Sequence, residues 1–239
     1  MRKITFSPDH YYHVYNRGTE QRVIFLDPAD YQRFTATMGE YRHGLVVIVA
    51  YVLMPNHFHL LVQPCADDSL SRYMHRLGTS FTMYFNARYE RSGGLFQGTY
   101  KAVAMDSTEQ LLHVSRYIHG NPVKDLREHS FEDRMQVLDH YPWSSYPDYV
   151  GGRTSGVVGK EFLTSCFLDL PTPDISISNE SKTQIVKKVE AKPRLTRLSK
   201  DRFCEPRFEE QYREFMGKWL KEIVKAKPRA KPRAQKSYA

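Results

Sequence analysis

Apolar residues recur along the first 120 positions with two periods, one typical of strands and the other of helices. Four segments are predicted to be strands because they alternate or are rich in aromatic and β-branched residues: 11–15, 45–53, 57–63 and 96–105. Three segments carry apolar residues three and four apart and are predicted to be helices: 30–41, 70–85 and 108–119. Asp27 and Pro28 suit the start of the first helix, and Asn121-Pro122 should end the third.

The order of these elements is strand, helix, strand, strand, helix, strand, helix, which suits an α+β fold. We expect a ferredoxin-like antiparallel sheet with helices packed on one face. The pattern weakens after Gly152, where a poorly ordered basic extension should begin. Four parts of the chain are therefore predicted: a folded domain over 1–152, an extension and linker over 153–202, an amphipathic helix over 203–224, and a basic disordered tail over 225–239.

The composition is that of a folded protein without a membrane span. Hydrophobic residues make up 41% and aromatic residues 13%, which is enough to form a core. The longest apolar run, 45–54, has ten residues, whereas a bilayer needs roughly 18 or more. The N-terminus has no apolar leader, so we expect a cytoplasmic protein. Three cysteines lie far apart and predict neither a disulfide framework nor a cysteine zinc site: Cys65, Cys166 and Cys204.

The net charge of +8 suggests a nucleic-acid partner, because neutralisation of phosphates dominates affinity for DNA and RNA. Six cations and no acid lie in 225–239, so two of the eight net charges remain for the rest of the chain. The charge therefore supports nucleic-acid binding weakly for the folded part and more strongly for the tail.

His57-Phe58-His59 is the first cluster with possible chemistry. Residues two apart on a strand point to the same face, so the two imidazoles could share one metal ion while Phe58 points into the core. The pair alone is equally consistent with packed or surface histidines. Imidazole suits transition metals better than magnesium, which indicates manganese without selecting it.

The second cluster is the heptapeptide 116–122, with the sequence RYIHGNP. Tyr117 and Asn121 lie one helical turn apart, so an Asn121 oxygen could join a metal site beside a tyrosine nucleophile. Pro122 biases Asn121 away from helical geometry, so His119 remains a rival ligand. Taken alone, Tyr117 is one of 16 tyrosines, and a core position would be its commoner role.

Five motifs in one order resemble the REP-associated tyrosine transposases, a branch of the single-tyrosine HUH transposases, also called IS200-like. The resemblance covers about 11–152. The motifs are Tyr15-Asn16-Arg17-Gly18, the segment 50–61 around the paired histidines, Gly94-Leu95-Phe96-Gln97-Gly98, the segment 116–123, and Trp143-Ser144-Ser145-Tyr146.

This resemblance implies a fold, a mechanism and a substrate. The fold would be ferredoxin-like, with 1–152 as the single-tyrosine HUH transposase catalytic domain. His57 and His59, completed by Asn121, would hold a divalent metal, Mg²⁺ or Mn²⁺. Tyr117 would attack phosphorus and leave a 5′-phosphotyrosine, so that a 3′-hydroxyl can later rejoin the DNA.

The implied partner is single-stranded or hairpin-forming palindromic DNA, bound by a nucleoid-associated monomer or homodimer. Arg17, Lys101 and Arg116 are candidate DNA contacts. Two other functions stay open. One is a domesticated hairpin-binding regulatory protein that rarely cuts, against which the retained histidines and Tyr117 count. The other is a replication-initiator or relaxase-like nickase, which the short chain disfavours.

The cationic tail leads to the first prediction. Removing residues 225–239 should weaken DNA binding regardless of sequence, because six cations that neutralise phosphates are lost. The measurement is the slope of log affinity against log salt concentration, which should become shallower. An unchanged slope would show that the tail does not touch DNA.

Overall fold

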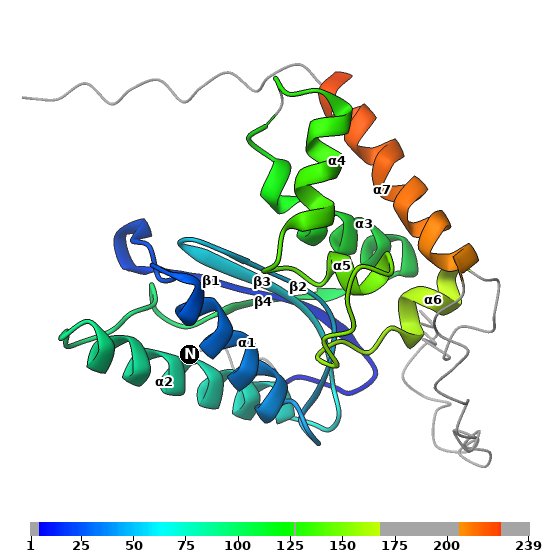
Figure 1. Ribbon diagram of the computed structural model, residues 1–239. Coiled ribbons are helices and arrows are strands. Elements are labelled where there is room, and N and C mark those ends of the chain that lie inside the picture. The colour runs from blue at the N-terminus through cyan, green and yellow to red at the C-terminus, as the bar shows by residue number, and fades with distance from the viewer. Residues whose placement is uncertain (1–4, 127, 168–205, 226–239) are drawn as a thin grey trace, which may run out of the picture.

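The computed structural model describes residues 5–126, 128–167 and 206–225 (Figure 1). Four strands form one antiparallel sheet in the order β2-β3-β1-β4. Their bounds are β1 Tyr11–Arg17, β2 Val46–Met54, β3 His57–Pro64 and β4 Lys101–Met105. This is the strand order of a ferredoxin-like sheet, so the predicted fold class is confirmed.

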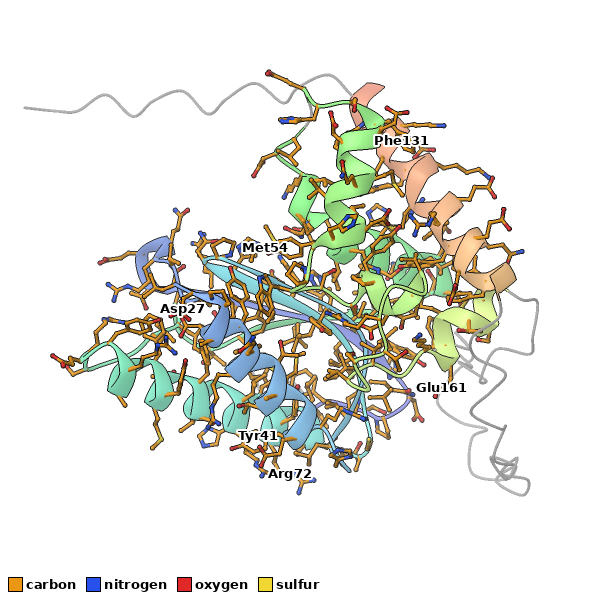
Figure 2. The ribbon with its side chains drawn as sticks, in the orientation of Figure 1. Asp27, Tyr41, Met54, Arg72, Phe131 and Glu161 are labelled. Carbon is orange, nitrogen blue, oxygen red and sulfur yellow. The ribbon has the colours of Figure 1, made fainter. Side chains whose placement is uncertain are left out.

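Two long helices cover one face of the sheet, as the helical spacing predicts. They are α1, Pro28–Tyr41, and α2, Ser69–Arg88. Figures 1 and 2 show both helices below the sheet with side chains filling the layer between. Phe34, Phe58 and Phe81 meet there at ring distances of 4.9–5.1 Å and are nearly fully buried. Phe58 thus faces the core, as the alternation on its strand predicts.

The expectation that all helices pack on one face needs correction for the third helix. α3, Thr108–His119, lies on the opposite face, so the sheet is covered on both sides (Figure 1). The reason lies in β2, which is buried on both faces: Ile48 and Leu53 belong to the layer under α1, whereas Ala50 and Val52 belong to the α3 layer. A strand that is apolar on both sides requires cover on both sides.

The α3 layer is completed by further helices. They are α4 Phe131–His140, α5 Tyr146–Tyr149, α6 Glu161–Phe167 and α7 Pro206–Lys225, with two 3₁₀ turns, Thr19–Gln21 and Asn121–Val123. The predicted helix over 203–224 therefore exists, and it packs against the body. Buried Phe162 and Leu163 show that packing continues past Gly152. Most of the predicted linker and 226–239 of the predicted tail lie outside the described residues.

β4 begins five residues later than predicted. Residues 96–100 leave the ladder because Gly98 adopts a φ of +69°, which a regular strand does not allow. The Asn16 side-chain amide donates to the Gly98 carbonyl at 3.2 Å and fixes this turn. Phe96 keeps only an isolated bridge to Gly18. No helix within the described ranges is both long and apolar enough to cross a membrane.

The turn that leads into β3 is held by the segment before α1. The Pro55 carbonyl accepts hydrogen bonds from the Ile24 and Phe25 amides at 2.8 and 3.1 Å. Because Pro55 lies two residues before His57, this segment helps to fix where β3 begins.

A buried carboxylate holds that segment in turn. Asp30 is fully buried and accepts hydrogen bonds from the Leu26 amide at 2.7 Å and from the Tyr89 and Tyr84 hydroxyls at 2.8 and 3.0 Å. Asp30 also completes a capping box with Asp27, the residue that precedes the helix. The predicted start of α1 is therefore confirmed.

Asp30→Ala should lower the free energy of unfolding by about 2–3 kcal/mol, because the substitution leaves buried donors without an acceptor. Urea denaturation is the measurement. Asp67→Ala, at an exposed acid, is the matched control and should change stability little. Equal stability of the two variants would contradict the role assigned to Asp30.

Candidate active site

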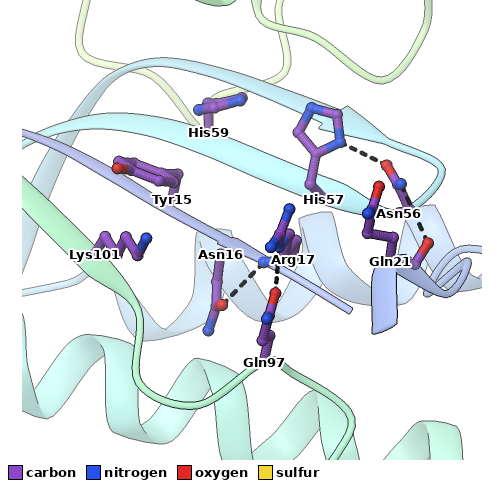
Figure 3. Close-up of a pocket in the computed structure, with 9 residues that line it drawn as sticks. All are labelled: Tyr15, Asn16, Arg17, Gln21, Asn56, His57, His59, Gln97 and Lys101. Atoms are coloured by element: carbon purple, nitrogen blue, oxygen red, sulfur yellow. Dashed lines mark hydrogen bonds between the residues drawn. The ribbon is translucent and has the colours of Figure 1, made fainter. Parts of the chain in front are cut away.

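The paired histidines lie at one end of the sheet, on the face that α3 leaves partly open. Arg17 stands opposite His57 and Tyr15 opposite His59 across the β1–β3 ladder. Residues directly opposite one another share a face, so four polar side chains from two strands converge. They open into a cavity of about 520 Å³ (Figure 3). Its wall also includes Asn16, Gln21, Asn56, Gln97 and Lys101.

His57 is half-buried and is oriented by its neighbours. Its Nδ1 lies 2.6 Å from Asn56 Oδ1, and the Asn56 amide nitrogen donates to the Gln21 carbonyl at 3.3 Å (Figure 3). The second bond fixes which end of the amide faces the ring, so His57 Nδ1 donates and Nε2 keeps its lone pair. His57 also shares a side-chain hydrogen bond with Asn121. Two residues that are 64 positions apart in the sequence are therefore neighbours in the fold.

His59 is nearly buried and contacts a third histidine. Its Nδ1 lies 2.9 Å from His13 Nε2, and the two rings stack with centroids 5.1 Å apart. Burial, together with the positive forms of His13 and His57 and the charge of Lys124, lowers the pKa of His59 to about 3. Burial also lowers the pKa of His13 to about 4. These imidazoles are therefore neutral at pH 7, which is the form that binds metals.

Burial lowers the pKa of His57 as well, with a hydrogen bond to Asn121 acting in the opposite sense. Among the described residues, no three or more His, Cys, Asp or Glu side chains are grouped as a metal site. A metal here would depend on two imidazoles and the Asn121 amide oxygen, with other positions taken by water or phosphate oxygens. Such a mixed nitrogen and oxygen set fits Mn²⁺ and tolerates Mg²⁺.

Tyr117 lies next to the histidines because of how α3 is held. Ser107 caps the helix by accepting from the Gln110 amide, and buried Leu111 and Ile118 fix its inner side against the sheet. Half-buried Tyr117 then presents its ring to His59, edge to face, with centroids 5.3 Å apart. Tyr117 of α3 and the two histidines of β3 are therefore neighbours within a single chain.

Two further groups surround Tyr117 that the sequence did not single out. His13 lies edge to face at a centroid distance of 5.9 Å, and Lys124 Nζ lies 5.3 Å from the ring centroid. His13 was recognisable in principle, because it lies two and four residues before Tyr15 and Arg17 on one strand face. Lys124 had no such signal, since only the turn after α3 brings it back over the ring.

Asn121 lies directly beyond the end of α3. It is 6% exposed, and its side-chain nitrogen donates to the Tyr117 carbonyl at 3.3 Å. The chain leaves the α-helix at Gly120 and continues as a 3₁₀ turn, so Pro122 bends the path without removing Asn121 from the site.

His119, the rival ligand, does not join the pair. It is fully buried, and both ring nitrogens are occupied, with Tyr212 and Ser145 hydroxyls at 2.7 Å.

The three candidate DNA contacts are not in one place. Arg17 and Lys101 line the cavity, and Arg17 donates to Gln97 (Figure 3). Arg116 lies elsewhere, with its guanidinium 4.4 Å from the Phe215 ring centroid on α7. The sequence could not separate them, because the direction of Arg116 depends on a partner helix a hundred residues away.

Comparisons with known proteins give a family match and a shared fold. Residues 6–121 match the model of the family described as transposase IS200 like. One similar solved structure is that of a REP-associated tyrosine transposase bound to a REP hairpin, with a TM-score of 0.50 and 18% sequence identity. The match covers 67% of this chain and 88% of that chain, and at this identity it shows a shared fold. No curated protein matches the chain.

Proposed function

Because residues 6–121 match the IS200-like transposase family, we propose that the protein is a DNA transposase that cuts and rejoins single-stranded, hairpin-forming DNA through a covalent tyrosine intermediate. Tyr117 is the nucleophile. His57 and His59, with the Asn121 amide oxygen, hold a divalent metal, Mn²⁺ or Mg²⁺.

One observation carries the proposal. A half-buried tyrosine lies 5.3 Å, ring to ring, from a neutral buried histidine, and that histidine forms the wall of a polar cavity. Burial keeps these imidazoles neutral, and a neutral imidazole is the form that binds a metal ion. Two of them on one strand face beside a tyrosine suit phosphoryl transfer.

The metal site depends on the orientation of each imidazole. With Nδ1 of His57 donating to Asn56, its Nε2 is available as a ligand. His59 can offer Nε2 only if its Nδ1 carries the proton and donates to His13. A bound divalent ion would supply Lewis-acid stabilisation of the charge that grows on the phosphoryl oxygens.

Strand cleavage is then a transesterification that conserves bond number. The Tyr117 oxygen loses its proton to water and attacks phosphorus, forming an O–P bond. The bond from phosphorus to the 3′-oxygen breaks, and that oxygen takes up a proton. A 5′-phosphotyrosine and a 3′-hydroxyl result, and the reverse attack by a 3′-hydroxyl rejoins DNA without a nucleotide cofactor. Lys124, whose Nζ lies 5.3 Å from the Tyr117 ring centroid, offers a positive charge to the phosphate beside the nucleophile.

The cavity suits a nucleic-acid strand. Arg17 and Lys101 offer charge to phosphates on one side of the histidines, and Tyr15 and Asn16 offer ring and amide groups to bases. The related structure contains a REP hairpin, which supports hairpin DNA as the substrate class.

The proposed role of His59 as a metal ligand can be tested by substitution. His59→Ala should weaken Mn²⁺ binding by about a hundredfold or more, because loss of an outer-shell partner alone typically costs ~10–100-fold. Isothermal titration calorimetry measures this. The control is His43→Ala, at an exposed histidine, which should bind Mn²⁺ like the parent. Cleavage that persists in EDTA, or unchanged Mn²⁺ affinity in His59→Ala, would refute the metal role.

The nucleophile prediction tests the enzyme itself. Tyr117→Phe removes one oxygen and keeps the ring, so hairpin binding should remain within about twofold of the parent while adduct and cleavage products disappear. Labelled hairpin DNA with Mn²⁺, followed by denaturing electrophoresis, reports the covalent adduct.

The other outcomes of that experiment identify the rival functions. Cleavage without an adduct in Tyr117→Phe would indicate an ordinary nuclease that uses water. An adduct in Tyr117→Phe would move the nucleophile to another tyrosine. Binding without any cleavage by the parent protein would indicate a hairpin-binding regulatory protein.

A further inference from the structure

The C-terminal helix α7 lies outside the family segment 6–121, yet it contacts the part of α3 that carries Tyr117. Figure 1 shows α7 running along the α3 and α4 layer, on the side away from the sheet. Its buried residues recur at helical spacing: Phe208, Tyr212, Met216 and Leu220. They belong to the same core as Ile118. The helix α3 is therefore enclosed between the sheet and α7.

Three contacts connect α7 to residues beside the nucleophile. The Tyr212 hydroxyl lies 2.7 Å from His119 Nδ1. The Phe215 ring lies under the Arg116 guanidinium at 4.4 Å. The Trp219 ring covers Gly120 so closely that a Cβ there would be 2.0 Å from Trp219 Cζ3.

These contacts surround Tyr117 on its own helix. Arg116 precedes Tyr117, and His119 and Gly120 follow it within one turn. The helix α7 therefore packs against the outer side of the helical turn that carries Tyr117. His119 also connects α3 to the sheet. Its Nε2 lies 2.7 Å from the Ser145 hydroxyl, and that hydroxyl accepts a hydrogen bond from the Tyr51 amide of β2 at 2.8 Å. The nucleophile helix is thus connected by buried hydrogen bonds to both of its neighbouring layers.

We propose that α7 is a positioning element of the active site, which acts through His119, Gly120 and Arg116 to hold Tyr117 and Asn121 against the histidines of β3. The inference rests on the proposed role of Tyr117. In-line attack requires the reacting atoms within about 3.5 Å, and a displacement of ~1 Å can cost ~100-fold in rate. A twelve-residue helix is marginal by itself, so its position depends on what packs against it.

The test uses Gly120→Ala, Trp219→Ala and the double variant, each in the full chain. Gly120→Ala adds a methyl group where the Trp219 ring lies, so α7 and α3 must move apart. We expect the single-turnover rate of adduct formation at saturating hairpin DNA to fall about 10–100-fold. Hairpin affinity should stay within about twofold, because the cavity residues on β1 and β3 are untouched, whereas Mn²⁺ affinity should fall, because Asn121 moves together with Tyr117.

The double variant distinguishes positioning from a local effect of the methyl group. Trp219→Ala alone should slow adduct formation by a few-fold, and adding it to Gly120→Ala should restore the rate to about that level, since the clash is gone. If the double variant is as slow as Gly120→Ala, the loss is local and the role of α7 is refuted. Parent rates in both single variants would refute it too.

A second pair of variants tests the hydrogen bond. Tyr212→Phe should slow adduct formation about tenfold, whereas Tyr73→Phe should not slow it. Tyr73 is the matched control, because it is equally buried and its hydroxyl donates to the Met38 carbonyl at 3.2 Å in the opposite layer. Equal rates for the two would contradict the proposal. Tyr117→Phe is measured in parallel. A covalent adduct in Tyr117→Phe would overturn the proposed function. If Tyr117→Phe forms no adduct while the Gly120, Trp219 and Tyr212 variants are fully active, only the role of α7 is overturned.

Discussion

The active site depends on the register in which β1 pairs with β3. That register sets Arg17 opposite His57 and Tyr15 opposite His59, and it directs Phe58 into the core beneath. A shift by one residue would exchange the two faces, exposing Phe58 and forcing two imidazoles into an apolar layer. Because both changes are costly, the hydrophobic core fixes the polar site. The same register sets His13 opposite Leu61 and diagonal to His59, whose Nδ1 lies 2.9 Å from His13 Nε2.

The second requirement is that the histidines remain neutral, and their surroundings achieve this in two ways. Burial disfavours the charged imidazoles most, and positive charge on neighbouring groups, including Lys124, adds to the effect. A folded part with little net charge can still offer positive charge to a phosphate, because Arg17 and Lys101 both lie at the cavity.

The sequence predicted elements whose periods are strong and local. The bounds of α3 agree with the helical spacing, and β2 and β3 begin within a residue of their predicted positions. The side of the sheet that α3 covers was not predictable, because a period shows that a helix has an apolar face and not which face of the sheet receives it. The start of β4 was missed because Gly98 interrupts an otherwise strand-like run. The short helices α5 and α6 carry too few turns for a period to be recognised.

The direction of individual side chains was least predictable, and α7 explains why. Arg116 and His119 were candidates for DNA and metal, and both are turned toward a helix that starts at residue 206. Local sequence gives the spacing of these residues around Tyr117, but a contact with Phe215 or Tyr212 is settled by long-range packing. The family segment ends at residue 121, within the turn that α7 covers. Without α7, His119 would lose its Tyr212 partner and Gly120 would lose the cover of the Trp219 ring. The candidate site residues thus lie within the family segment, whereas the layer that packs on the outer side of α3 is completed by the second half of the chain.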